Sequence, residues 1–175
     1  MKILKIISNI ILFPFKLIIR CISNLRTKKL INSLNINDLD KISGVDFENI
    51  LAYLFSKLHF KVDTTPVSGD FGADLILQKW KTKIVVQCKL YYNHSVGNKA
   101  IYEVNASKSY YDADVAIAIT NHKYSTPATQ LADKLNVILI DRNGVKKLLT
   151  DNKKNNLTYL KRLVVNNLHK KNLRI

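Results

Sequence analysis

Between residues 42 and 150, hydrophobic positions follow helical and strand-like spacings in turn. Apolar residues recur at helical spacing over 47–58, and Ser43 precedes them where an N-terminal cap is expected, with Asp46 three residues later. The next segment, 60–65, alternates in the manner of a strand. The pattern therefore predicts a helix that leads into a sheet.

The rest of this region alternates between strands and helices. The further predicted elements are strands at 73–79 and 83–90, a helix at 97–111, a strand at 115–120, a helix at 125–135, a strand at 137–141 and a helix at 144–150. The first two of these strands are joined by a short turn and form an antiparallel hairpin. The later two are continuous apolar runs, which are typical of strands covered on both faces. We therefore expect an α/β fold with a mixed β-sheet flanked by helices.

Length and composition indicate one folded domain with extensions. With 175 residues, of which 47% are hydrophobic, the chain can bury a core of ordinary domain size. Its two cysteines lie far apart and outside any cysteine or histidine cluster, so neither a disulfide framework nor a zinc site is indicated. We divide the chain into an apolar helix at 1–23, a polar linker with one short helical piece at 24–41, the domain at 42–150 and a basic amphipathic tail at 151–175.

The N-terminal part, 1–23, is apolar but interrupted. The stretch from Ile6 to Ile19 has 14 residues and contains Pro14 and Lys16, whereas a membrane-spanning helix needs about 20. A wide apolar face with a basic stripe is typical of a helix that lies among anionic headgroups, and it predicts attachment to the cytoplasmic face of a membrane. A helix packed on the domain and a cleaved signal peptide are the alternatives.

Positive charge is concentrated at the two ends of the chain. The net charge is +15, of which +7 lies in residues 1–35 and +6 in residues 151–175, so only +2 falls on the residues between them. Such ends favour anionic partners, either nucleic acid or a lipid surface. The tail at 151–175 has apolar residues near helical spacing. Two alternatives stay open for it: it docks on the domain, or it contacts lipid or DNA.

Candidate chemistry lies on the predicted hairpin. Side chains alternate along a strand, so Gln87 and Lys89 point to the same face, and Asp74 can oppose them from the preceding strand. Oxygen ligands of this kind suit Mg²⁺, with Mn²⁺ as a substitute. Asp74 would be the main ligand, joined by Glu48 from the first helix, the Gln87 amide oxygen and the backbone carbonyl of Cys88. The alternative is a weak cross-strand ion pair between Asp74 and Lys89.

Four sequence blocks carry a family resemblance. They are ISGVDFENILAYLFSKLHFKV, TPVSGDFGADLI, VVQCKLY and AIAITNHKYSTPATQLADKLNVILIDRNGVKKLL. In this order they resemble the Mrr-like restriction endonuclease family, a branch of the PD-(D/E)XK nuclease superfamily. The resemblance implies that Glu48 is the helix acid, that Asp74 is the metal-binding acid, and that Gln87 and Lys89 form the QxK variant of the motif. Members are typically Mg²⁺-dependent DNA endonucleases directed at modified or foreign DNA.

The expected function is therefore metal-dependent cleavage of DNA, of the restriction or defence type, by a domain tethered to a membrane. A homodimer would suit double-strand cleavage. Asn121, Lys123 and Ser125 follow a buried strand, where loops commonly bind ligands, and they are candidate DNA phosphate contacts. Two alternatives stay open: a non-catalytic DNA-binding or scaffold module that retains the nuclease fold, and a Holliday-junction or repair nuclease.

Overall fold

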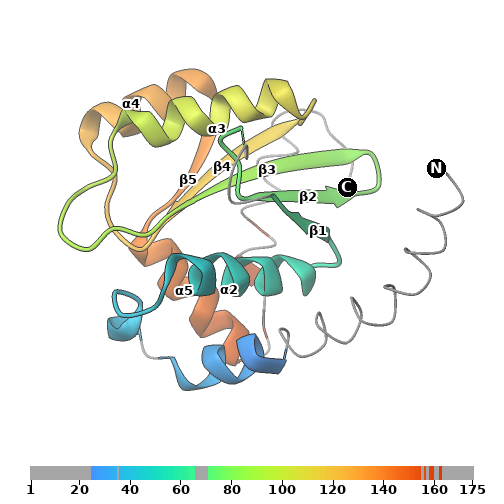
Figure 1. Ribbon diagram of the computed structural model, residues 1–175, viewed down its shortest axis with the longest axis vertical. Helices are drawn as coiled ribbons and strands as arrows, with labels where there is room; N and C mark the ends of the chain where they lie inside the picture. The colour runs from blue at the N-terminus through green and yellow to red at the C-terminus, as the bar shows by residue number, and fades with distance from the viewer. Residues whose placement is uncertain are drawn as a thin grey trace, which may run out of the picture.

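The computed structural model describes residues 25–34, 36–65 and 71–154, and four single positions beyond them, 156, 158, 159 and 162. These residues form a five-stranded sheet with helices on both faces (Figure 1). After a helical stretch at 25–33, the elements are η1 (Ile36–Asp38), α2 (Gly44–Ser56), β1 (Lys61–Thr64), β2 (Leu75–Lys79), β3 (Thr82–Lys89), α3 (Asn98–Tyr110), β4 (Val115–Thr120), α4 (Thr126–Leu135), β5 (Val137–Ile140) and α5 (Arg142–Lys153).

The sheet is mixed, as the sequence predicts. Its strands lie in the order β1-β2-β3-β4-β5, so each strand neighbours the next one along the chain. The pairs β1–β2 and β2–β3 are antiparallel, whereas β3–β4 and β4–β5 are parallel. The parallel pairs need long connections, which α3 and α4 provide. The predicted α/β fold, a mixed sheet flanked by helices, is confirmed for the described residues.

Two hydrophobic cores lie on opposite faces of the sheet. Helices α2 and α5 cover one face, and α3 and α4 cover the other (Figure 1). Along β3, Val86 and Cys88 belong to the core beneath α2 and α5, whereas Val85 belongs to the core beneath α3 and α4. Because side chains alternate along a strand, Gln87 and Lys89 lie on the α3 side. The sheet therefore directs its polar pair toward α3.

Two predicted helix starts are confirmed by their caps. The Ser43 hydroxyl accepts a hydrogen bond of 3.0 Å from the Asp46 N–H and caps α2. The Ser125 hydroxyl accepts one of 3.2 Å from the Ala128 N–H and caps α4, with Pro127 in the first turn. These side chains satisfy backbone donors that have no partner within a helix.

The region predicted as a linker is partly ordered and packed. Residues 25–33 are helical, and Ile31 and Leu39 are fully buried in the core beneath α2 and α5. The Lys153 ammonium donates a hydrogen bond of 2.7 Å to the backbone carbonyl of Leu34, which ties this segment to the end of α5. The segment differs from a free linker because Ile31, Leu34 and Leu39, which its many polar residues conceal in the sequence, are buried against the domain.

The two charged ends of the chain fall largely outside the described residues. The predicted apolar helix at 1–23 and most of the predicted tail at 151–175 lie there, apart from the last residues of α5 and a few single positions. Among the helices that are described, none has both the length and the hydrophobicity needed to cross a bilayer.

Candidate active site

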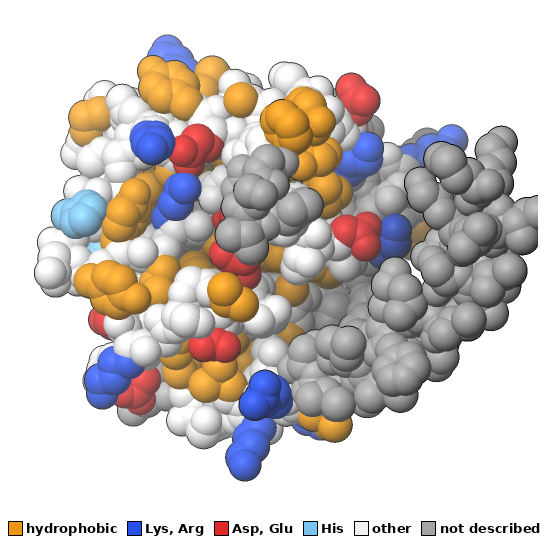
Figure 2. All heavy atoms as spheres, in the orientation of Figure 1, with side chains coloured by type: hydrophobic (Ala, Val, Ile, Leu, Met, Phe, Trp, Pro, Cys, Tyr) orange, Lys and Arg blue, Asp and Glu red, His pale blue; other side chains and the backbone are white. Residues whose placement is uncertain are grey.

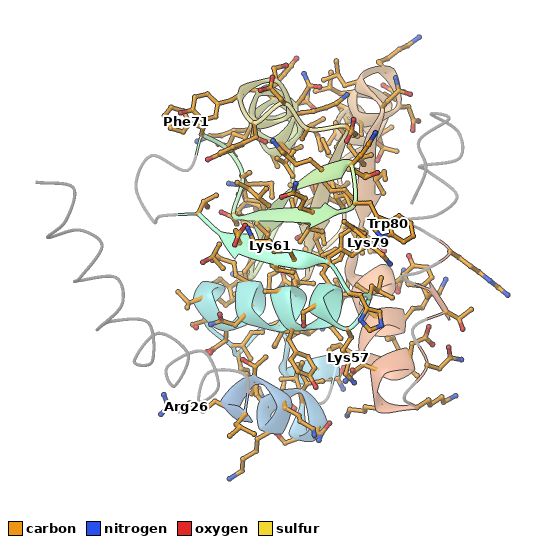
Figure 3. All side chains as sticks on the ribbon, turned by 90° about the vertical axis from the view of Figure 1, so that its right-hand side faces the viewer. Arg26, Lys57, Lys61, Phe71, Lys79 and Trp80 are labelled. Atoms are coloured by element: carbon orange, nitrogen blue, oxygen red, sulfur yellow. The ribbon has the colours of Figure 1, made fainter. Side chains whose placement is uncertain are left out.

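The β2–β3 hairpin brings Asp74 opposite the end of β3. In the register of the hairpin, Leu75 pairs with Val86, and the Asp74 N–H donates a hydrogen bond of 2.8 Å to the Val86 carbonyl. Asp74 therefore immediately precedes the first residue of β2 and lies opposite Gln87. In Figure 3, the labelled Phe71, which lies in the segment before β2, is at one end of the hairpin, and Trp80 is in the turn at the other end.

The Asp74 carboxylate is fixed by two short hydrogen bonds. Its Oδ2 atom accepts from the Gln87 side-chain nitrogen at 2.6 Å and from the Cys88 backbone N–H at 2.6 Å. Because β2 begins at Leu75 while β3 runs on to Lys89, the carboxylate occupies the place of a strand partner for Cys88. Hydrogen bonds to an ionised carboxylate are stronger than those between two neutral groups, so these two bonds fix the orientation of the Asp74 side chain.

The Gln87 amide leaves one acceptor unused. Gln87 is only 3% exposed, and its Oε1 atom is buried without a hydrogen-bond partner among the described residues. A buried acceptor without a partner costs about 1–3 kcal/mol, so such an atom calls for a donor or a cation. Amide oxygens are among the ligands that hard divalent cations take.

Lys89 is held by Glu103, a residue that the sequence pattern alone does not mark as part of the site. The Lys89 Nζ atom lies 2.8 Å from Glu103 Oε2, and the two side chains are 27% and 28% exposed. Burial acts to lower the Lys89 pKa, but the contact with Glu103, together with the negative charge of Asp74, outweighs it and raises the pKa above its usual value. Lys89 is therefore an ammonium group at neutral pH.

Glu48 approaches the site from the opposite face of the sheet. It lies on α2 and is half-buried. Burial raises the pKa of the Cys88 thiol well above its usual value, and the charges of Asp74 and Glu48 raise it further. Both carboxylates are thus close enough to Cys88 to act on it, Asp74 from the start of β2 and Glu48 from α2.

The donor set fits a cation that keeps water in its shell. Within the described part of the chain, no three His, Cys, Asp or Glu side chains come together to enclose a metal ion. Mg²⁺ seldom needs such a cage, because it retains several waters and takes one or two carboxylates. The oxygen atoms available here are of the type that Mg²⁺ binds: the carboxylates of Asp74 and Glu48, the unpaired Gln87 Oε1 atom and the Cys88 carbonyl.

Gly72 sets the path of the chain into Asp74. It has a φ of +85°, and a Cβ atom added to it would lie 2.5 Å from the backbone carbonyl oxygen of Glu103. Only glycine adopts this conformation readily and allows so close an approach. The backbone that delivers Asp74 therefore rests directly on α3 at the residue that binds Lys89.

Asn121 has a structural position rather than one at the surface. It is fully buried; its amide oxygen accepts from the Tyr91 N–H at 2.8 Å, and its amide nitrogen donates to the Tyr91 carbonyl and to Asp40, both at 2.7 Å. Arg142 donates to the same Asp40 oxygen at 2.6 Å and, against the opposing effect of burial, keeps the Asp40 pKa below its usual value. We therefore leave Asn121 out of the proposed DNA contacts.

The other two candidate phosphate contacts are placed differently. Lys123 is exposed, whereas Ser125 is half-buried and its hydroxyl caps α4. The Ser125 hydroxyl uses an oxygen lone pair for the cap, so its proton is available to another acceptor. DNA contact by Lys123 and Ser125 stays a prediction.

Comparison with protein families identifies the domain. Residues 39–149 match the family model Mrr_cat, described as a restriction endonuclease. The chain belongs to this family. The family resemblance inferred from the four sequence blocks is confirmed. No curated protein matches the chain.

AF1548 and AspBHI, two solved structures with TM-scores above 0.5, share the fold of this Mrr_cat domain. AF1548, a protein of unknown function, has 18% identity and a TM-score of 0.53, with coverage of 60% of this chain and 64% of AF1548. The DNA modification-dependent restriction endonuclease AspBHI has 16% identity and a TM-score of 0.51, with coverage of 85% and 40%. The restriction endonuclease MspJI, solved with a 27-mer oligonucleotide, has 17% identity, a TM-score of 0.46 and coverage of 70% and 31%. The aligned region spans less than two thirds of each of these proteins.

Proposed function

We propose that this Mrr_cat protein is a divalent-cation-dependent DNA endonuclease of the restriction type. The observation that carries the proposal is the arrangement of Asp74, Gln87 and Lys89 at adjoining strand ends, within a domain of a restriction endonuclease family. A carboxylate, an amide oxygen and an ammonium group in one place suit hydrolysis of a phosphodiester.

The cation would be held where the start of β2 meets the end of β3. Asp74 and Glu48 would contribute carboxylate oxygens, Gln87 its unpaired Oε1 atom and Cys88 its main-chain carbonyl. The cation would supply Lewis-acid stabilisation of the charge that develops on the phosphate. Gln87 would then serve two functions at once, since its nitrogen orients the Asp74 carboxylate and its Oε1 atom, which has no hydrogen-bond partner among the described residues, would bind the cation.

Lys89 would stabilise charge rather than act as a base. Its ammonium group is held by Glu103 and can donate hydrogen bonds to a phosphate oxygen or orient the attacking water. Glu103 restrains the long lysine side chain, which lowers the entropy lost when Lys89 engages a substrate. The Lys89 side chain keeps 27% of its surface exposed, so it is not sealed in the core.

Cleavage of DNA by the full-length protein is the direct test. Supercoiled plasmid incubated with Mg²⁺ or Mn²⁺ should be nicked and linearised, and EDTA should abolish both products, because the phosphate then loses its Lewis acid. Gel electrophoresis measures the two products over time. The same assay on modified plasmid, unmodified plasmid and four-way junctions separates the alternatives.

Each substrate pattern in that assay supports a different function. Preference for modified plasmid favours restriction, and preference for junctions favours a repair nuclease. DNA binding without cleavage of any substrate contradicts the proposal and favours the non-catalytic module. The non-catalytic alternative has some support, because DNA-cleaving surfaces need positive charge to bind phosphates. On the face in Figure 2, the Lys and Arg side chains are scattered among hydrophobic and uncharged ones rather than gathered in one patch.

We also propose that residues 1–23 attach the protein to the cytoplasmic face of a membrane. The proposal is supported by the apolar sequence with Lys2, Lys5, Lys16 and Arg20 interspersed, since apolar burial and attraction to anionic lipid act together at an interface. Full-length protein should sediment with vesicles that contain phosphatidylglycerol, and a variant of residues 24–175 should stay in solution.

Vesicles of neutral lipid provide the control for that sedimentation. Binding should be weaker to them, and it should fall as salt is raised, because screening reduces the attraction of lysine and arginine to anionic lipid. Equal sedimentation of the full-length and shortened proteins would show that residues 1–23 do not attach the chain. A homodimer for double-strand cleavage is a further proposal, which the molar mass in solution tests.

A further inference from the structure

The chain has only two glutamates, Glu48 and Glu103, and both lie by the site. Glu103 is on α3, whose residues Ala100, Ile101 and Val104 are buried against the sheet. Its position beside these residues turns the carboxylate toward β3 rather than into solvent. With a side chain 28% exposed, Glu103 is far more enclosed than most surface glutamates.

Formal charges show why the site needs this residue. Gln87 is a neutral amide, so Asp74 and Lys89 together sum to zero, and Glu48 brings the total only to −1. Glu103 brings it to −2, the charge that matches a divalent cation. Neighbouring charges act strongly in a partly buried site, because the effective dielectric there is lower than in water.

The surroundings of Glu103 differ from those of an ordinary surface ion pair. Its Oε1 atom is 3.9 Å from Lys99, which is 88% exposed and therefore a weak partner. Its Oε2 atom contacts the enclosed Lys89, and its main-chain carbonyl leaves no room for a Cβ atom on Gly72, in the segment that leads to Asp74. One residue thus restrains both ends of the polar constellation.

We propose that Glu103 is a positioning residue of the cation site: it fixes the Lys89 ammonium and supplies the negative charge that the Gln87 amide lacks. This inference rests on the proposed metal-dependent function. Glu103 acts through Lys89 and through its charge, and it is not itself a ligand in this arrangement. The buried, unpaired Gln87 Oε1 atom is the independent sign that a cation belongs beside it.

The test measures Mn²⁺ binding to the full-length protein by electron paramagnetic resonance of the free ion. Glu103→Gln should weaken Mn²⁺ affinity about tenfold, since residues beyond the ligands commonly contribute that much. Glu103→Asp, which keeps the charge, should retain most of the affinity. Asp133→Asn removes a carboxylate from an exposed position on α4 and should bind as the wild type does.

Each outcome of this experiment decides the inference. Equal affinity of wild type and Glu103→Gln overturns it, and so does an equal loss in Glu103→Asp and Glu103→Gln, because charge is then not the cause. A loss in Asp133→Asn as large as that in Glu103→Gln overturns it as well. If the wild type binds no Mn²⁺, the proposed function fails together with this inference. Circular dichroism confirms that each variant is folded, and Glu103→Ala, which also removes the charge, replaces Glu103→Gln if the latter is not folded.

Discussion

Replacing Asp74 with asparagine is expected to abolish plasmid cleavage while the protein stays folded. The asparagine side chain has the same shape and can still accept a hydrogen bond from the Cys88 N–H, but it loses the charge that faces the site. Loss of a cation's stabilisation of phosphate charge removes several kcal/mol, which corresponds to at least about a hundredfold in rate. The measurement is the initial rate of plasmid nicking at saturating Mg²⁺.

Two controls make the Asp74→Asn result specific. Asp133→Asn changes an exposed acid on α4 and should cleave at the wild-type rate. Lys89→Met should lose cleavage as Asp74→Asn does, yet it should retain Mn²⁺ binding, because Lys89 repels a cation rather than binding it. Full cleavage by Asp74→Asn would show that the catalytic residues have been assigned wrongly, even though the family assignment of the domain would stand.

The hairpin part of the site could be predicted because strand geometry fixes it. Side-chain alternation places Gln87 and Lys89 on one face, and a short turn leaves little freedom in the register that brings Asp74 opposite them. The contacts among Asp74, Gln87 and Cys88 follow from that register. Local sequence is sufficient for this part because every partner lies within one hairpin.

Glu103 could not be selected in the same way. In the helix at 97–111, the spacing of Ala100, Ile101 and Val104 indicates an apolar face, and Glu103 borders that face. A residue in such a border position can turn toward solvent or toward the sheet, and the choice depends on how α3 rotates over β3. The presence of only two glutamates in the chain was a usable signal, but a weak one.

Asn121 illustrates a contact that local sequence conceals. Loops that follow buried strands often bind ligands, which made Asn121 a candidate for phosphate contact. In the structure its amide binds Asp40, which lies 81 residues away and outside the predicted domain. Sequence patterns place residues on elements and faces, but they do not reveal which distant segment will cover a loop.

Gly72→Ala is expected to reduce both stability and cleavage. Alanine at a φ of +85° is strained, and its Cβ atom would meet the Glu103 carbonyl oxygen at 2.5 Å, a backbone atom that cannot move without shifting α3. Strain of this kind costs about 1–3 kcal/mol, and the clash adds to it. Urea unfolding should therefore show a lower free energy of unfolding, by about 2 kcal/mol or more.

Gly97→Ala is the matched control, because a Cβ atom at Gly97 would meet nothing within 4 Å and Gly97 is not in the left-handed region. It changes the N-cap of the same helix and should alter the free energy of unfolding by less than about 1 kcal/mol. In the fraction of Gly72→Ala that is folded, nicking should still be slow, because relief of the clash displaces Asp74 from Gln87 or Glu103 from Lys89. If Gly72→Ala matched Gly97→Ala in both measurements, the close contact between this loop and α3 would not be what holds the site together.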